Sequence, residues 1–143
     1  MATLSLFADL AQLATIREFL DQVGHGLGLD DREIYDLQLA VDEACSNVVK
    51  HGYAGQGGEI EITMEREENR VRVTVRDWGK SFDPQAVPAP DVTASLAQRR
   101  LGGLGLFLIH QVMDDVHFEF DPEEGNVLTM VKQLQARGGE EWT

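Results

Sequence analysis

The segment VDEACSNVVKHGY, residues 41–53, contains a carboxylate and an amide at helical spacing. Glu43 and Asn47 are four positions apart, which places them one above the other on a helix. Glu43 has no Lys or Arg three or four positions away for a helix-surface ion pair, and Asn is a poor helix-interior residue. A carboxylate and an amide oxygen placed this way can hold a divalent cation and a hydroxyl together. An ordinary solvated helix face is the alternative interpretation.

A second candidate site is VRDWGKSFDP, residues 75–84, where Asp77 directly follows a strand-like pattern. A buried carboxylate there can accept a hydrogen bond from an exocyclic amine, and Gly79 would let a flat ring approach the backbone. An ordinary turn residue is the alternative. The Gly-Lys-Ser run resembles the end of a P-loop, but that motif needs a glycine five positions before its Gly-Lys pair, where Thr74 stands. The P-loop interpretation is therefore excluded.

A third candidate is the glycine run Gly102, Gly103 and Gly105, which precedes an apolar stretch. Glycines at the start of a helix expose backbone N–H groups, and the helix dipole adds partial positive charge there, which suits a polyphosphate. Arg99 and Arg100 stand beside the run. A plain hinge is the alternative, and the run does not fit the G-x-G-x-x-G pattern of a dinucleotide site.

The charge of the chain restricts its partners. Its 25 acidic residues against 12 basic ones give a net charge of -13, which repels nucleic acid, so we expect no nucleic-acid partner. The same charge repels a nucleotide unless backbone N–H groups, a few basic residues or a cation neutralise the phosphates, so we expect Mg²⁺ with any nucleotide.

A single cysteine excludes an intramolecular disulfide, and no apolar run approaches the roughly 18 residues of a membrane span. We expect a cytoplasmic location and no membrane partner.

Hydrophobic periodicity of about 3.6 residues predicts the helices. The first begins after Asp9, and its pattern is interrupted by glycines between 24 and 28. Asp30 or Asp31 caps a second helix that carries the first candidate segment and ends near Gly52.

Alternation with a period of two predicts the strands. Residues 60–65 and 71–76 form one hairpin, residues 116–120 and 127–134 form another, and residues 3–7 can add an edge strand. Helices that cluster early and strands that follow in hairpins predict an α+β fold, a two-layer sandwich with helices on one face of a mixed, mostly antiparallel sheet.

The remaining residues complete the predicted domain. Residues 82–103 are weakly patterned and read as a long loop of the kind that often forms a lid, and a further helix follows Gly105. We expect a single domain over residues 1–136 and a polar tail over 137–143.

The helix DEACSNVVKHGY, the strand end DWGKSFD and the loop GGLGLFLI, in this order and spacing, resemble the N, G1 and G2 boxes of the GHKL ATPases. The EAxxNxxxHxY form of the first box and the continuation LGLFLIHQVMDDV look like the anti-sigma-factor serine/threonine kinases of that superfamily. The resemblance covers residues 4–134 and implies the Bergerat ATP-binding fold. One departure is Ser81, which stands where the G1 box usually has its second glycine.

The resemblance implies a role for each candidate residue. Glu43 would be the general base toward a protein hydroxyl, Asn47 a ligand of Mg²⁺, and Asp77 the acceptor for adenine. Arg100, or Arg99 beside it, would meet the γ-phosphate. The residues implied as nucleotide contacts are Asn47, Asp77, Gly79, Phe82, Arg100, Gly102, Gly103, Leu104, Gly105 and Leu106.

The function that the resemblance implies is an anti-sigma factor with Mg-ATP-dependent kinase activity toward serine or threonine of a STAS-domain anti-anti-sigma partner. A sigma factor would be its second partner, and a homodimer is left open. Two alternatives stay open as well. One is a nucleotide-binding module that switches partners without catalysis, and the other is a switch kinase of a stress complex that binds no sigma factor.

Overall fold

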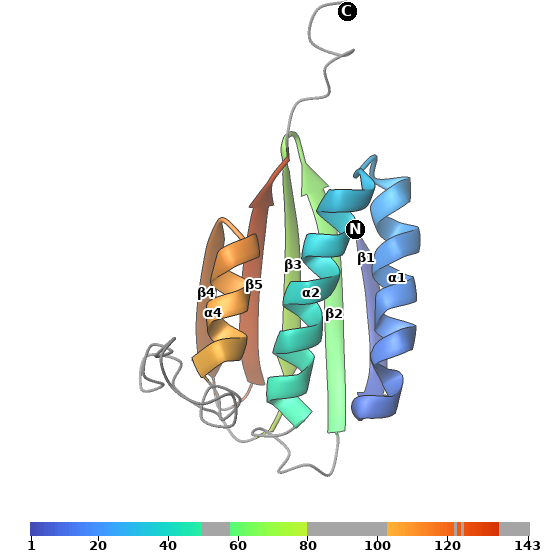
Figure 1. Cartoon of the computed structure of the whole chain (residues 1–143). Helices are drawn as coiled ribbons and strands as arrows, with labels where there is room; N and C mark the ends of the chain where they lie inside the picture. The colour runs from blue at the N-terminus through green and yellow to red at the C-terminus, as the bar shows by residue number, and fades with distance from the viewer. Residues whose placement is uncertain (50–57, 80–102, 122, 124, 135–143) are drawn as a thin grey trace, which may run out of the picture.

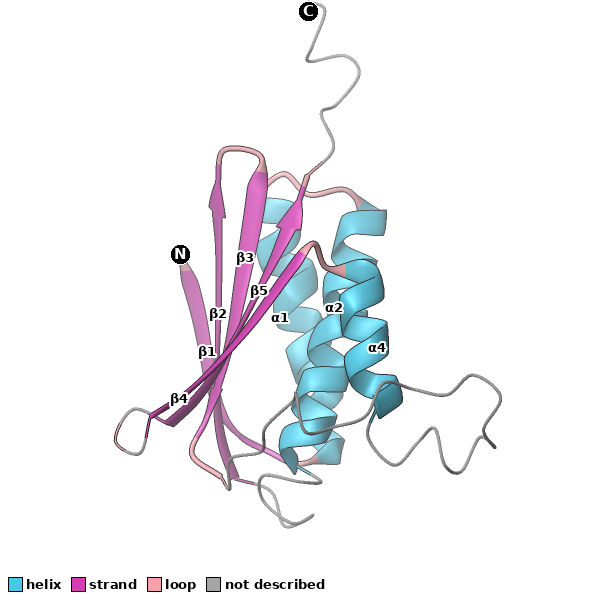
Figure 2. Ribbon diagram, turned by 90° about the vertical axis from the view of Figure 1, so that its left-hand side faces the viewer, coloured by secondary structure: helices cyan, strands magenta, loops and turns pink. Residues whose placement is uncertain are grey.

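The computed structural model of the chain describes residues 1–49, 58–79, 103–121, 123 and 125–134. Within these residues, one layer contains the helices α1 (Leu13–Gly26), α2 (Asp31–Asn47) and α4 (Gly103–Val112). The other layer contains the strands β1 (Ala2–Ala8), β2 (Gly58–Glu67), β3 (Arg70–Asp77), β4 (Asp115–Asp121) and β5 (Gly125–Gln133). The helices cover one face of the sheet (Figures 1 and 2). The predicted α+β sandwich is confirmed.

The strands form a five-stranded sheet in the order β1-β2-β3-β5-β4, and every neighbouring pair is antiparallel. Alternate residues of each strand face the helices, so Ile62 of β2 and its partner Val75 of β3 are buried while Thr63 and Thr74 face outward. The predicted hairpins and the edge strand are therefore present.

The first helix differs from the prediction. Asp9 caps a 3-10 turn over Leu10–Gln12, and α1 then continues through Gly24 to Gly26 rather than being interrupted. A Cβ atom on Gly24 would lie 2.7 Å from Cγ1 of Ile34 in α2. The glycine is thus explained by the close approach of two helices, which sequence periodicity does not reveal.

The second helix begins as predicted, with Asp30 as its cap. Oδ1 of Asp30 accepts from the backbone N–H of Glu33 at 2.7 Å, and Oε1 of Glu33 accepts from the backbone N–H of Asp30 at 2.9 Å. Regular α-helix extends to Asn47, and a wider π turn follows at residues 48–49. The predicted end near Gly52 lies outside the described residues.

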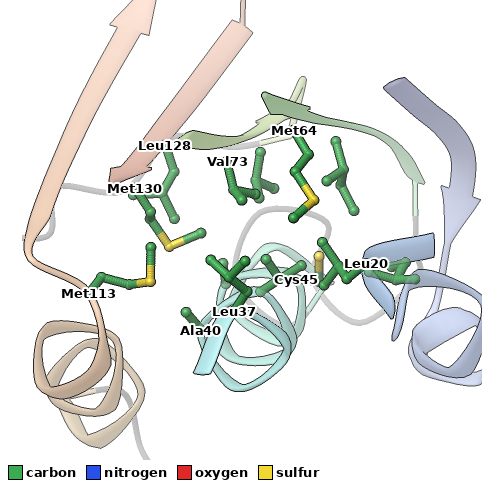
Figure 3. Close-up of a cluster of buried hydrophobic side chains, with 14 of the residues drawn as sticks. Leu20, Leu37, Ala40, Cys45, Met64, Val73, Met113, Leu128 and Met130 are labelled. Atoms are coloured by element: carbon green, nitrogen blue, oxygen red, sulfur yellow. The ribbon is translucent and has the colours of Figure 1, made fainter. Parts of the chain in front are cut away.

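The hydrophobic core lies between the two layers. Figure 3 shows Leu37, Ala40 and Cys45 of α2 opposite Val73 and Met130 of the sheet. These side chains are almost entirely buried, so α2 is fixed along its whole length against the sheet. None of the described helices is long and apolar enough to cross a membrane.

Candidate functional site: a carboxylate at the common end of three elements

The three predicted segments meet at one end of the molecule. The C-terminal end of α2, the C-terminal end of β3 and the N-terminal end of α4 lie at the same edge of the sandwich (Figure 1). Glu43 and Asn47 are half-buried residues in the last two turns of α2, and Asp77 is the last residue of β3. Segments far apart in sequence are therefore brought together where a ligand could contact all three.

Asp77 is held in one orientation. Its side chain is buried, and Oδ1 accepts hydrogen bonds from the backbone N–H of Gly79 at 2.9 Å and from Nδ2 of Asn126 at 3.0 Å. The same Nδ2 also donates to the carbonyl of Gly79 at 3.1 Å. Within the described residues, Oδ2 accepts no hydrogen bond. One carboxylate oxygen is therefore fixed by the protein, and the other is available to accept from a ligand N–H group.

Asn126 is a site residue that the sequence analysis missed. It lies between the predicted strands 116–120 and 127–134, but it is the first inward-facing residue of β5 and the cross-strand partner of Asp77. The available signal was its position in the alternation, since it shares the core-facing row with Leu128 and Met130. A polar residue in an apolar row needs a hydrogen-bond partner, and Asp77 supplies it.

The turn before Asn126 is also adapted to this contact. Gly125 has a φ of +90°, and a Cβ atom there would lie 2.5 Å from the backbone oxygen of Asp77. Any side chain at this position would push the turn away from the end of β3. The glycine therefore allows Asn126 to reach the carboxylate.

Two carboxylates lie near the buried Cys45 thiol of α2. Burial, together with the nearby carboxylates of Asp42 and Asp77, raises the pKa of the Cys45 thiol to about 12. Asp42 places Oδ2 2.7 Å from Nε of Arg17 in α1, while its Oδ1 is buried with no partner among the described residues. The thiol consequently stays protonated at physiological pH, and anionic groups of a ligand would need to lie away from this side of α2.

The helix α4 begins earlier than predicted. It starts at Gly103, so Gly103 and Gly105 belong to its first turn instead of preceding the helix. Ile109 and Met113 bury their side chains in the core, which outweighs the cost of about 1 kcal/mol that each helical glycine adds. The first four N–H groups of a helix have no intrahelical partner, so the backbone N–H groups of residues 103–106 point out of the N-terminal end. These include the predicted contacts Leu104 and Leu106.

Several predicted residues lie outside the described part of the chain: Phe82, Arg99, Arg100 and Gly102. Among the described residues, no group of three or more His, Cys, Asp and Glu side chains is arranged to hold a metal ion. A cation at this end would therefore need ligands from a bound substrate and from water as well as from the protein.

Comparison with known proteins shows the family of the chain. The histidine kinase-like ATPase domain family matches residues 6–132. The chain belongs to this family. Serine-protein kinase RsbW of Bacillus thuringiensis strain Al Hakam is 35% identical over 132 residues, which cover 90% of this chain and 81% of the relative. RsbW of Bacillus anthracis has the same identity and coverage. By this relationship the chain is a protein serine/threonine kinase.

Two solved structures share the fold. The RsbU and RsbW domains of a Mycobacterium tuberculosis protein match with a TM-score of 0.62 at 19% identity, covering 96% of this chain and 34% of that one. The SiaB-SiaC complex of Pseudomonas aeruginosa matches with a TM-score of 0.63 at 16% identity, covering 92% of this chain and 89% of that one. At these identities the likeness concerns the fold alone.

Proposed function

We propose that this chain binds Mg-ATP at the common end of α2, β3 and α4, and transfers the γ-phosphate to serine or threonine of a STAS-domain anti-anti-sigma protein. The observation that carries the proposal is the Asp77 carboxylate, which is buried, is fixed through Oδ1 and accepts no hydrogen bond at Oδ2 from the described residues. An adenine amine is a donor that such an acceptor recognises. Gly79, whose N–H donates to the same carboxylate, would let the ring approach the backbone.

The phosphates would extend from Asp77 toward the first turn of α4. The N–H groups of residues 103–106, which have no partner within the helix, and the positive end of the helix dipole favour an anion there. Mg²⁺, when bound, neutralises phosphate charge, and we assign Asn47 as its ligand from the protein. A site with one amide ligand fits Mg²⁺, which keeps several waters and takes other ligands from phosphate oxygens.

Glu43 is the proposed general base. It lies one turn before Asn47 on α2, so it can accept the proton of a serine hydroxyl while that oxygen forms its bond to the γ-phosphorus and ADP leaves. Phosphoryl transfer depends on positioning and on charge neutralisation, which α2, β3 and α4 together supply in this proposal.

Partner choice rests on the resemblance to the anti-sigma-factor kinases and on the serine-protein kinases among the relatives. We propose that the chain also sequesters a sigma factor and releases it when the STAS protein competes. Two alternatives are tested against this proposal. One is a switch kinase that binds no sigma factor, and the other is a nucleotide-binding module without catalysis.

The test is transfer of labelled γ-phosphate to the STAS protein that copurifies with the chain. Glu43→Ala is expected to keep near-normal ATP affinity and to slow transfer by about a hundredfold to ten-thousandfold, because a general base acts on the hydroxyl and not on nucleotide binding. Glu18→Ala, an exposed glutamate of α1, is the matched control and should transfer at the wild-type rate. Equal rates in wild type and Glu43→Ala would remove Glu43 from the mechanism, and no transfer by the wild type would favour the binding module.

A further inference from the structure

Lys132 occupies an unusual position in the sheet. It shares the core-facing row of β5 with Leu128 and Met130, and its side chain is only 14% exposed. Its cross-strand partner is the fully buried Val71. A charged ammonium at such a position is unfavourable unless it is paired and hydrogen-bonded.

The ammonium joins three elements. Nζ lies 3.0 Å from Oδ2 of Asp36 in α2 and donates to the backbone carbonyl of Val112, the last residue of α4, at 2.9 Å. Asp36 is itself 10% exposed, and its Oδ1 lies 3.3 Å from Nε of Arg32. A cation at a helix C-terminus also interacts favourably with the helix dipole. Lys132 thus ties the end of α4 to both α2 and β5.

Two neighbouring contacts hold the same end of α4. The backbone N–H of Asp114 donates to the carbonyl of Val131 at 2.9 Å, and Oδ2 of Asp114 accepts from the backbone N–H of Gln133 at 2.7 Å. Three successive residues of β5 therefore fix the exit of α4. This exit lies at the end of the molecule opposite the first turn of α4 (Figure 1).

We propose that Lys132, together with Asp36, is a positioning residue that aligns the first turn of α4 with α2. The inference rests on the proposed nucleotide site. A helix of 10 residues is about 15 Å long, so a tilt of about 4° at its fixed end moves the other end by about 1 Å. A displacement of about 1 Å in a positioned group can lower a rate by about a hundredfold.

A positioning role for Lys132 can be distinguished from simple stabilisation of the fold by comparing the affinities for two ligands. In the proposed site, Asp77 at the end of β3 contacts the adenine, whereas the first turn of α4 contacts the phosphates. Loss of the contact between Lys132 and Asp36 should therefore weaken binding of ATP and leave binding of adenosine unchanged. A purely structural role would lower the free energy of unfolding without separating the two ligands.

The experiment compares affinities for ATP and adenosine by calorimetry, well below the unfolding temperature, in Lys132→Met and Asp36→Asn. Each variant is expected to weaken ATP about tenfold and to change adenosine by less than twofold. The double variant should lose less than the product of the two single effects, because both act through one contact. Arg72→Met is the matched control, since it removes an ion pair with Glu65 on the outer face of the same sheet, and it should leave both affinities unchanged.

Three results would overturn the inference. Equal weakening of ATP and adenosine would make the pair a general stabiliser, and so would a lowered urea midpoint with normal ATP affinity. Wild-type protein that binds neither ligand would overturn the proposed nucleotide site together with the positioning role of Lys132. If Lys132→Met fails to fold, Asp36→Asn provides the same comparison, because it keeps the Lys132 bond to α4 and removes the negative charge that pairs with Lys132 from α2.

Discussion

The carboxylate of Asp77 is oriented by a residue from a different strand. A turn residue would make only the local bond between Oδ1 and the N–H of Gly79, whereas here Asn126 donates to the same oxygen from 49 positions along the chain. Because Asn126 also donates to the carbonyl of Gly79, it fixes both the carboxylate and the chain after it. Asp77 is therefore prepared for a ligand before any ligand arrives.

We predict that Asn126→Ala weakens adenosine and ATP by similar factors of about five to ten, since Oδ1 loses one of its two donors and the carboxylate gains freedom. Asn126→Asp should weaken both ligands further, because it places a second negative charge beside Asp77. Calorimetry with adenosine and ATP measures both effects. Normal affinity in a folded Asn126→Asp protein would contradict the role of Asn126.

At the scale of the elements, α1 and α2 pack so closely that glycine is needed between them. Gly24 is buried inside α1, and the space for its side chain is occupied by Ile34 of α2. Gly26, two positions further along the same helix, has no atom within 4 Å of a Cβ built upon it. The two glycines offer a matched pair with opposite surroundings.

We predict that Gly24→Ala lowers the free energy of unfolding by about 1 kcal/mol or more, because overpacking against Ile34 exceeds the gain in helix propensity. Gly26→Ala should be neutral or stabilise the protein by up to about 1 kcal/mol, since only the propensity term applies. Urea denaturation of both variants provides the measurement. A Gly24→Ala protein as stable as Gly26→Ala would mean that the helices adjust freely.

Sequence periodicity predicts the strands, the sheet layer and a cap at Asp30 or Asp31, of which the structure has Asp30, because these depend on neighbours in sequence. Sequence periodicity does not predict features that depend on contacts between residues far apart in the sequence. Periodicity alone makes Gly24 an interruption of α1 because it does not place Ile34 beside it, and it begins α4 too late because the burial of Ile109, which offsets the cost of the glycines, is a tertiary contact. Asn126 was missed because the register between β3 and β5 is a tertiary property.

At the scale of the molecule, the proposed site spans both layers. The sheet supplies the adenine acceptor, and the two helices that pack on it supply the groups for the metal and the phosphates. The last turn of α2 and the first turn of α4 lie at the same end of the molecule, while Lys132 and its neighbours fix the opposite end of α4. We therefore expect the loss of the Asp77 carboxylate to weaken nucleotide binding much more than it weakens the fold.

The most direct test of this account is ATP binding by Asp77→Asn, measured by calorimetry beside wild type and the exposed control Asp115→Asn. The substitution can keep both hydrogen bonds to Oδ1 while it replaces Oδ2 by an NH₂ group that faces the adenine amine. We predict a loss of about 2 kcal/mol, or about 30-fold in affinity, with an unfolding midpoint close to that of wild type. Normal ATP affinity in the folded variant would contradict the account and leave Asp77 as a turn residue.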